Sequence, residues 1–223
     1  CHSKMAVATP TPASDGKRIF AFFSSNDLIC LDLDGNLLWL RGLTHDYPNA
    51  SNSLGMASSP VVVGETVVVQ VENHADSFST GLDVKTGATR WHIKQTRSDN
   101  WSSPLVLKGK TPAENLVLLQ NSSGLTALEP LTGKQAWRFD QPAGRTPSAV
   151  VANGIVFVPS SGLTALKPGQ PGSKTPKILW QENRLYSGVL ELLRQLKTDG
   201  YRTGILSDKR QVFGEPELEF SGL

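Results

Sequence analysis

Tryptophan recurs in the same local setting four times along this chain of 223 residues. In each case a Leu-Asp-like pair is followed by a polar turn and then by a short apolar stretch that carries the indole. The intervals between successive tryptophans are 52, 46 and 43 residues, and a regular internal period of this size is typical of propellers and other repeat architectures. The four recurring residues are Trp39, Trp91, Trp137 and Trp180.

A Ser-Pro or Thr-Pro pair precedes each of these tryptophans by 27 to 33 residues. Short apolar stretches follow the proline, as at 66–71 and 155–158, and their β-branched and aromatic residues favour strands. The turn before each of the first three tryptophans contains a glycine, which can adopt a positive φ; these are Gly35, Gly87 and Gly133. Each repeat therefore predicts four antiparallel strands, one blade of a propeller, and we expect the indoles to pack between blades.

The third repeat has the sequence Ala127-Leu128-Glu129, then Thr132-Gly133-Lys134, then Trp137, with Ser103-Pro104 upstream. This pattern resembles the pyrroloquinoline-quinone-type propeller repeat. That family includes quinoprotein alcohol dehydrogenases, the propeller lipoprotein of the bacterial outer-membrane barrel-assembly machinery, and envelope proteins without known enzyme activity. The resemblance implies an all-β β-propeller of four-stranded antiparallel blades and a periplasmic or envelope-associated location in a bacterium.

The propeller is predicted over residues 1–185, with a tail of different character over 186–223. Family members usually close into a ring with more than four blades, commonly eight, so the resemblance implies an incomplete arc. An open arc leaves two apolar blade faces exposed, and self-association is therefore expected. The predicted blades are approximately 5–43, 54–95, 100–140 and 144–182.

Composition excludes several classes of partner. The formal net charge is +2 and no basic cluster is interleaved with aromatic residues, which argues against a nucleic acid partner. No apolar run is long enough for a transmembrane helix. Cys30 lies in an apolar stretch and is expected to be buried. Cys1 could be a lipidated lipoprotein terminus or an arbitrary starting point within a longer chain, and the second interpretation is preferred.

The resemblance raises the question of a quinone site. In the dehydrogenases of the family the cofactor lies on the propeller axis, between a tryptophan and a disulfide of adjacent cysteines, with Ca²⁺ bound by carboxylate and amide oxygens. This chain has no adjacent cysteines. Oxygen ligands could come from Glu72-Asn73, Asp76 and Asp99-Asn100 beside Trp101, but we expect these to be solvated loop residues. No catalytic, cofactor-binding or metal-binding residue is therefore predicted.

The longest irregular stretch between blades is 44–55, which joins the first tryptophan strand to the second blade. Long polar loops on a rigid scaffold are where binding surfaces are commonly built. This loop is the predicted contact surface for a protein partner, with His45, Tyr47, Asn49 and Asn52 as its candidate residues.

The tail has the pattern of an α/β unit. Apolar residues at 189, 192, 193 and 196 predict an amphipathic helix that ends at Gly200, and a short strand at 203–206 leads to Ser207. Residues 187–208 resemble a fragment of a haloacid-dehalogenase-like hydrolase, in which Ser207 would contact the phosphoryl group. Asp32-Leu33-Asp34-Gly35 copies the nucleophile motif of those enzymes, but the sister repeats align Asp32 with blade-turn residues.

Three functional classes follow. The preferred prediction is a non-enzymatic propeller scaffold of the cell envelope that binds protein partners through inter-blade loops. The alternative is a quinoprotein oxidoreductase fragment that uses pyrroloquinoline quinone and Ca²⁺. The third and least favoured is a phosphatase that acts through the tail, because without a nucleophile Ser207 has no chemistry of its own.

Overall fold

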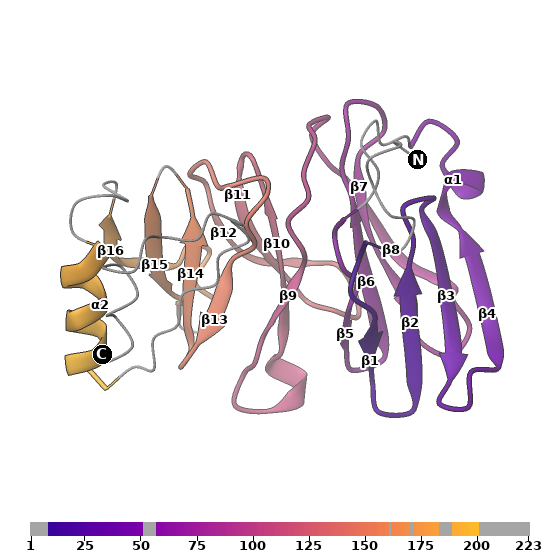
Figure 1. Ribbon diagram of the computed structural model, residues 1–223, viewed down its shortest axis with the longest axis horizontal. Helices are drawn as coiled ribbons and strands as arrows, with labels where there is room; N and C mark the ends of the chain where they lie inside the picture. Colours follow the sequence, from indigo (N-terminus) through magenta and orange to yellow (C-terminus); the bar gives the residue numbers. More distant parts are fainter. Residues whose placement is uncertain (1–8, 51–56, 161, 170–171, 183–188, 201–223) are drawn as a thin grey trace, which may run out of the picture. The chain divides into compact units, whose positions relative to one another are not determined.

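The chain folds into four antiparallel β-sheets, each built from four strands that follow one another in sequence (Figure 1). The computed structural model describes residues 9–50, 57–160, 162–169, 172–182 and 189–200. It divides into two compact units, Cys1–Asn183 and Arg184–Leu223. The predicted all-β class is confirmed, and the first unit is an incomplete β-propeller of four blades.

Each blade is a meander in which neighbouring strands are hydrogen-bonded and antiparallel. The first blade contains β1 (Ala13–Ser14), β2 (Arg18–Phe22), β3 (Asp27–Asp32) and β4 (Leu37–Gly42). The second contains β5 (Val61–Val63), β6 (Thr66–Val71), β7 (Phe78–Asp83) and β8 (Thr89–Lys94). The third contains β9 (Leu105–Leu107), β10 (Leu116–Asn121), β11 (Gly124–Leu128) and β12 (Gln135–Phe139). The fourth contains β13 (Val150–Ala152), β14 (Ile155–Pro159), β15 (Leu163–Lys167) and β16 (Lys177–Glu182).

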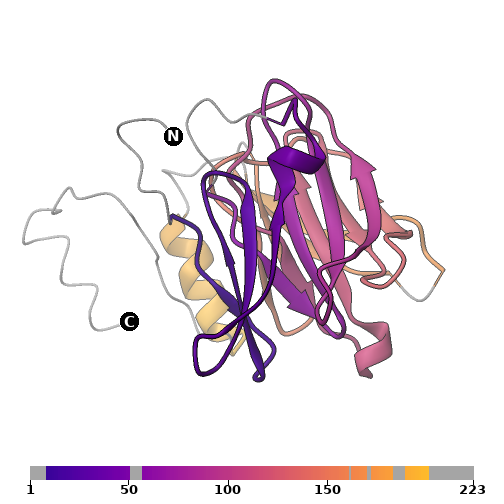
Figure 2. The ribbon, with the colours of Figure 1, turned by 90° about the vertical axis from the view of Figure 1, so that its right-hand side faces the viewer.

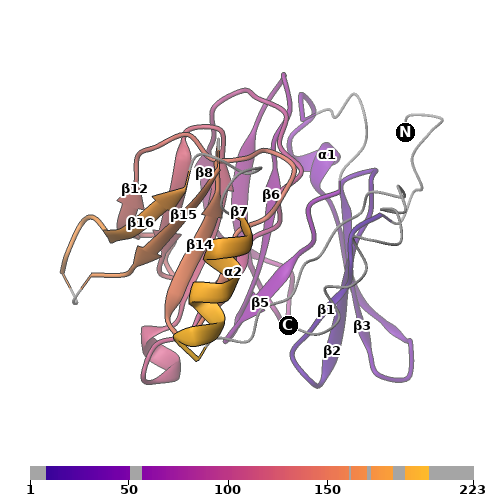
Figure 3. The same cartoon turned by 60° about the vertical axis from the view of Figure 1, so that its left-hand side comes forward.

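The first strands of the blades lie side by side, since β1 contacts β5, β5 contacts β9 and β9 contacts β13. Short helices occur in the connections: α1 (Leu43–Asp46) leaves the first blade, and the 3-10 helix η1 (Pro112–Glu114) joins β9 to β10. Figure 2 looks from the side of the first blade, with later blades behind it, and Figure 3 brings the fourth blade forward.

In every blade the tryptophan on the fourth strand is paired with a small residue on the third strand. The register pairs are Cys30 with Trp39, Gly81 with Trp91, Ala127 with Trp137 and Ala165 with Trp180. A β-bulge follows the small residue in each blade. A side chain at Gly81 would place its Cβ 2.3 Å from the Trp91 ring, so the third strand must be small where the indole crosses it.

The tryptophan face of each of the first two blades contacts the next blade. The Nε1 of Trp39 donates a hydrogen bond to the Val84 carbonyl at 3.1 Å, and the Nε1 of Trp91 donates to the Pro130 carbonyl at 2.7 Å. A Cβ on Gly87 would lie 2.8 Å from the Trp39 ring, so the indole rests directly on the turn of the following blade.

Burial distinguishes the inner blades from the terminal ones. All six residues of β6 are buried, whereas β2 and β14 alternate between buried and half-buried residues. The inner blade packs on both faces, and each terminal blade packs on one face only. A strand in which buried and half-buried residues alternate therefore belongs to a blade at one end of the arc.

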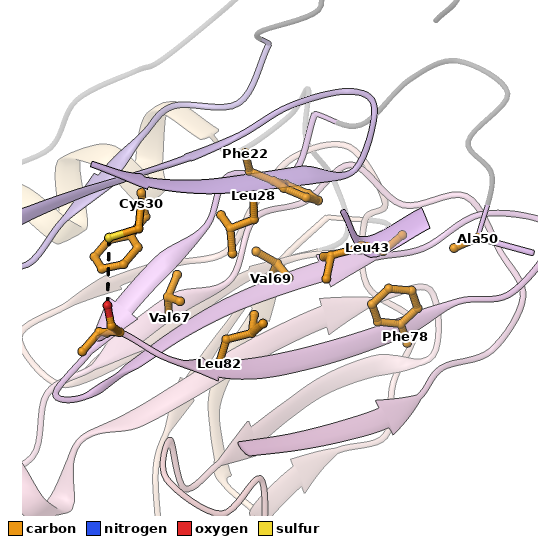
Figure 4. Packing of buried hydrophobic residues seen from close by; sticks show 12 residues of the cluster. Phe22, Leu28, Cys30, Leu43, Ala50, Val67, Val69, Phe78 and Leu82 are labelled. Atoms are coloured by element: carbon orange, nitrogen blue, oxygen red, sulfur yellow. Dashed lines mark hydrogen bonds between the residues drawn. The ribbon is translucent and has the colours of Figure 1, made fainter. Parts of the chain in front are cut away.

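The core consists of apolar layers between successive blades. Phe20, Phe22, Leu28 and Cys30 of the first blade pack against β6 and β7 of the second (Figure 4). Cys30 is a fully buried free thiol, in agreement with its apolar setting in the sequence. Other layers join the second blade to the third and the third to the fourth.

The second unit contains helix α2 (Val189–Thr198), close to the predicted helix. Gly200 follows it with a φ of 84°, a left-handed conformation that favours glycine at the end of a helix. The predicted strand at 203–206 and Ser207 lie outside the described residues.

Candidate functional site

The connection from the first to the second blade is only partly irregular. The sequence predicted a loop from residue 44, but α1 occupies its first part. Leu43 and Ala50 are buried at the two ends of this segment. Arg41 forms an ion pair with Asp46 and also donates to the Gly87 carbonyl. The described part of the segment, residues 43–50, is therefore fixed to the first two blades.

Tyr47 packs inward as part of this fixed segment. Its ring stacks on His92, with centroids 4.4 Å apart and planes 17° apart, and it also contacts Phe78 at 4.4 Å. Burial, and to a lesser extent the neighbouring Asp46 carboxylate, raise the pKa of the Tyr47 hydroxyl. Desolvation lowers the pKa of His92, so its ring is held towards the neutral form. The tyrosine thus anchors the segment on the second blade.

Other candidate residues of the segment point to solvent. The His45 side chain is 94% exposed. Asn49 is exposed, and its backbone carbonyl accepts a hydrogen bond from the Asp76 amide at 3.2 Å. Pro48 and Thr44 are exposed as well. Asn52 lies outside the described residues. The described part of the loop therefore presents His45, Pro48 and Asn49 on a backbone held by Tyr47 and Arg41.

A buried polar cluster lies near the ends of β6 and β10. Glu72 and Asn100, which form an isolated β-bridge, are 1% and 2% exposed, and Asn73 is 1% exposed. The expectation that these residues are solvated is wrong, because the packed blades enclose them. Asp76 and Asp99 remain nearer the surface, where Asp99 contacts His74 at 2.8 Å and Asp76 contacts Arg97 at 3.2 Å.

Glu72 is the electrostatic centre of this cluster. Burial raises its pKa to about 7, although amide donors from Gln70, Asn121 and Asn100 act in the opposite direction. The Gln70 amide donates to Glu72 Oε1 at 2.9 Å, whereas Glu72 Oε2 has no hydrogen-bond partner among the described residues. The carboxyl group is therefore largely protonated below neutral pH.

Two glutamines extend the cluster across three blades. The Gln70 amide, on the second blade, also donates to the Gln120 carbonyl of the third blade at 2.7 Å. The Gln120 side chain donates to the Pro147 carbonyl at 2.8 Å and accepts from the Ala149 amide at 2.8 Å. The sequence interpretation missed both glutamines; the available signal was an amide residue within each of two otherwise apolar strands.

The residues of this cluster do not fit the quinone and Ca²⁺ site of the dehydrogenases. Burial raises the pKa of the carboxyl group at its centre to about 7, which disfavours the charged form, and the Gln70 and Asn100 amide groups donate to Glu72 and to the Gln120 carbonyl. Ca²⁺ instead requires several converging oxygen ligands. In the part of the chain that the structure describes, no group of three or more His, Cys, Asp or Glu side chains could hold a metal ion. Cys30 is a free thiol with no cysteine next to it in the sequence, so it does not provide the disulfide of adjacent cysteines.

Asp32, the candidate nucleophile of the hydrolase-like motif, ends β3 and fixes the turn after it. Its carboxylate accepts hydrogen bonds from the Asn36 side-chain amide at 2.8 Å and from the backbone amides of Asn36 at 2.8 Å and Asp34 at 3.0 Å, and these lower its pKa. Asp83 accepts from two turn amides in the same way in the second blade. The acceptor capacity of Asp32 is used by the turn, as expected of a blade-turn residue.

The repeat geometry and the match to a protein family both indicate a propeller repeat protein. The family described as outer membrane protein assembly factor BamB matches residues 2–213 of the chain. The chain belongs to this BamB family. Its sheets, bulges and repeated indoles are accordingly those of a pyrroloquinoline-quinone-like propeller repeat protein. No curated protein sequence matches the chain significantly.

Solved structures show the same fold at low sequence identity. BamB from Moraxella catarrhalis is 19% identical, with a TM-score of 0.54 over 77% of this chain and 48% of that one. Quinohemoprotein alcohol dehydrogenase ADHIIG from Pseudomonas putida HK5 is 17% identical, with a TM-score of 0.52 over 79% of this chain and 34% of that one. The computationally designed Ika4 protein is 13% identical, with a TM-score of 0.52 over 74% and 93% of the two chains.

The chain thus spans about half the length of the BamB from Moraxella catarrhalis to which it is similar. Among the described residues, no helix has the length and apolar character to span a membrane.

Proposed function

We propose that this member of the BamB family is a non-enzymatic propeller scaffold that acts in outer-membrane protein assembly in the bacterial cell envelope. It binds protein partners through its inter-blade loops. Membership of the family supports the process and the location. The observation that carries the binding role is the segment after β4, which presents exposed side chains on a backbone fixed between two blades.

The physical argument is one of preorganisation. The Tyr47 stack and the Arg41 contacts hold the segment in one arrangement, so a partner would lose little conformational entropy in the loop on binding. His45 and Asn49 supply polar groups, and Pro48 adds a rigid apolar surface. The polar atoms of the buried cluster are mostly engaged in joining blades, which leaves the loops as the available recognition surface.

Substitution at the loop surface tests the proposal. His45→Glu combined with Asn49→Lys changes only exposed side chains, so the fold is expected to stay intact while partner capture falls at least tenfold. The measurement is photo-crosslinking from position 44, which is exposed and is not changed in the variant, in envelope preparations, followed by identification of the captured protein. The matched control is Lys134→Glu, whose side chain is 76% exposed on the turn of another blade.

Deletion of 45–53 would be a poorer test, since it removes Tyr47 and Ala50 from the core. Equal crosslinking by the double variant and by the wild type would contradict the loop as the binding surface. We expect the Lys134→Glu variant to capture the same protein as the wild type, and the double variant to fail to capture it.

We expect no quinone binding. Adding pyrroloquinoline quinone and Ca²⁺ to the protein should leave the cofactor's absorption spectrum and the melting temperature unchanged, because burial disfavours the charged form of the Glu72 carboxyl group that would bind Ca²⁺. A red-shifted absorbance that saturates at one cofactor per chain would instead support an oxidoreductase.

A further inference from the structure

The first two pairs of neighbouring blades are joined by the same kind of contact, in which a tryptophan of one blade packs on a turn of the next. We call the tryptophan face of a blade the wedge, and the turn between the third and fourth strands of the following blade the socket. The Trp39 wedge donates to the Val84 carbonyl and covers Gly87; the Trp91 wedge donates to the Pro130 carbonyl and covers Gly133. Both socket glycines have a φ near 70°, and a Cβ on either would lie under 3 Å from the indole.

The first blade carries a socket that no wedge among the described residues fills. Leu33 and Gly35 occupy the positions of Val84 and Gly87, and Gly35 has a φ of 89°. Nothing lies within 4 Å of a Cβ built at Gly35. Leu33 is 61% exposed, whereas Val84 in its filled socket is 1% exposed. Strands β2 and β3 of this blade also carry apolar residues that are only half-buried: Ile19, Ala21, Ile29 and Leu31.

The fourth blade carries a wedge that no socket in the described part of Cys1–Asn183 receives. Its Trp180 contacts Phe157 with ring centroids 6.0 Å apart and planes at 48°, which matches the 5.9 Å and 46° of Phe20 and Trp39 in the first blade. The wedge is therefore formed in the same geometry. Phe20 is fully buried in its junction, but Phe157 and Trp180 are only half-buried, and Val150 beside Phe157 is 59% exposed.

The outer strands of the two terminal blades are more apolar than those of the inner blades. Beside the tryptophan, β4 carries Leu37, Leu38 and Leu40, and β16 carries Ile178 and Leu179, all 40% exposed or more. The equivalent positions of the inner blades are polar apart from Ala136; they are Thr89, Arg90, His92, Gln135, Ala136 and Arg138. Among the described residues, the exposed large apolar side chains gather on the two terminal blades, with Leu131 as the exception, which indicates that both open ends are covered in the working protein.

We propose that a second copy of this chain covers both ends. The Trp180 wedge of one copy enters the Leu33–Gly35 socket of the other, and the reverse contact closes a two-fold ring in which each copy supplies four blades. The proposal extends the blade-to-blade contact already present within the chain, and wedge and socket are parts of the same sequence. A contact of this head-to-tail kind closes when the rotation between copies completes the ring.

Sedimentation and light scattering of the 223-residue protein provide the test. We expect a species with twice the 24.1 kDa mass of one chain. Trp180→Ala and Leu33→Arg should each raise the dissociation constant at least a hundredfold, because one removes the wedge and the other blocks the socket with a charge. Leu131→Arg is the matched control, since Leu131 is 55% exposed on a turn of an inner blade, and it should leave the dimer unchanged.

Mixing the two variants distinguishes this arrangement from a contact between like faces. A Leu33→Arg chain keeps its wedge and a Trp180→Ala chain keeps its socket, so an equimolar mixture regains one intact junction and part of the dimer. Circular dichroism of each variant checks that the strands remain folded. A monomer at micromolar concentration, an open-ended polymer, or a mixture that dimerises no better than either variant alone would overturn the proposal. A monomer would instead point to further blades of a longer polypeptide as the natural cover.

Discussion

Replacing Trp91 by alanine is expected to lower the free energy of unfolding by about 3 to 5 kcal/mol, the range for deleting a large aromatic side chain from a packed core. The indole is 7% exposed and lies between the Gly81 strand and the Gly133 turn of the next blade. Neither glycine has a side chain that could move into the vacated space. The variant also loses the hydrogen bond from Nε1 to the Pro130 carbonyl, which leaves that acceptor without its partner.

Urea denaturation followed by circular dichroism measures this effect through the shift in midpoint. The control is Trp101→Ala, because Trp101 is half-buried in a connection and is outside the repeat. Trp101→Ala should lower the free energy of unfolding by less than half as much as Trp91→Ala. Equal destabilisation by the two substitutions would show that the indole at position 91 does not join the blades more strongly than any other tryptophan.

Replacing Glu72 by glutamine is expected to stabilise the protein at alkaline pH. The pKa of Glu72 is raised from 4.5 to about 7 in the folded protein. Between these two values the unfolded chain has released its proton while the folded protein still holds it, so stability falls as the pH rises through this window. The full penalty is reached above about pH 7 and amounts to about 3 kcal/mol on conversion of the shift to free energy.

Glutamine has nearly the same shape and carries no charge to bury, so the variant should lose this part of the pH dependence. The measurement is the unfolding midpoint of wild type and Glu72→Gln at pH 5 and pH 8, with a clear gain for the variant only at pH 8. Glu65→Gln is the control, because the Glu65 side chain is 60% exposed and its pairs with Lys85 and Arg90 lie at the surface. Parallel pH profiles for wild type and Glu72→Gln would show that the carboxyl group is solvated after all.

Trp91 and Glu72 affect the stability of the propeller in different ways. Trp91 holds neighbouring blades together through apolar contact, and Glu72 belongs to a polar cluster that joins the second, third and fourth blades at the ends of β6 and β10. A cluster of this kind is costly unless its groups are hydrogen-bonded, and both Glu72 Oε2 and Gln70 Oε1 lack a partner among the described residues. The apolar layers therefore supply the stability, and the carboxyl group makes that stability depend on pH.

The candidate contact segment shows where sequence interpretation reached its limit. Its length and polar composition indicated an irregular loop between blades, but its first part is the short helix α1. Tyr47 nevertheless packs on His92 and Phe78, which lie more than thirty residues away in the chain. Sequence spacing carries no information about such a contact, because it arises only when the second blade folds back beside the first.

The sequence by itself determined the four-stranded blade, its turns and the position of each tryptophan, because these depend on a local period, on β-branched stretches and on glycines that tolerate a positive φ. Only the tertiary structure decided which faces are covered. Phe20 and Phe157 occupy equivalent positions, yet one is fully buried and the other is half-buried. The burial of Glu72 is likewise a property of packed blades, since desolvation depends on atoms brought close from distant parts of the chain.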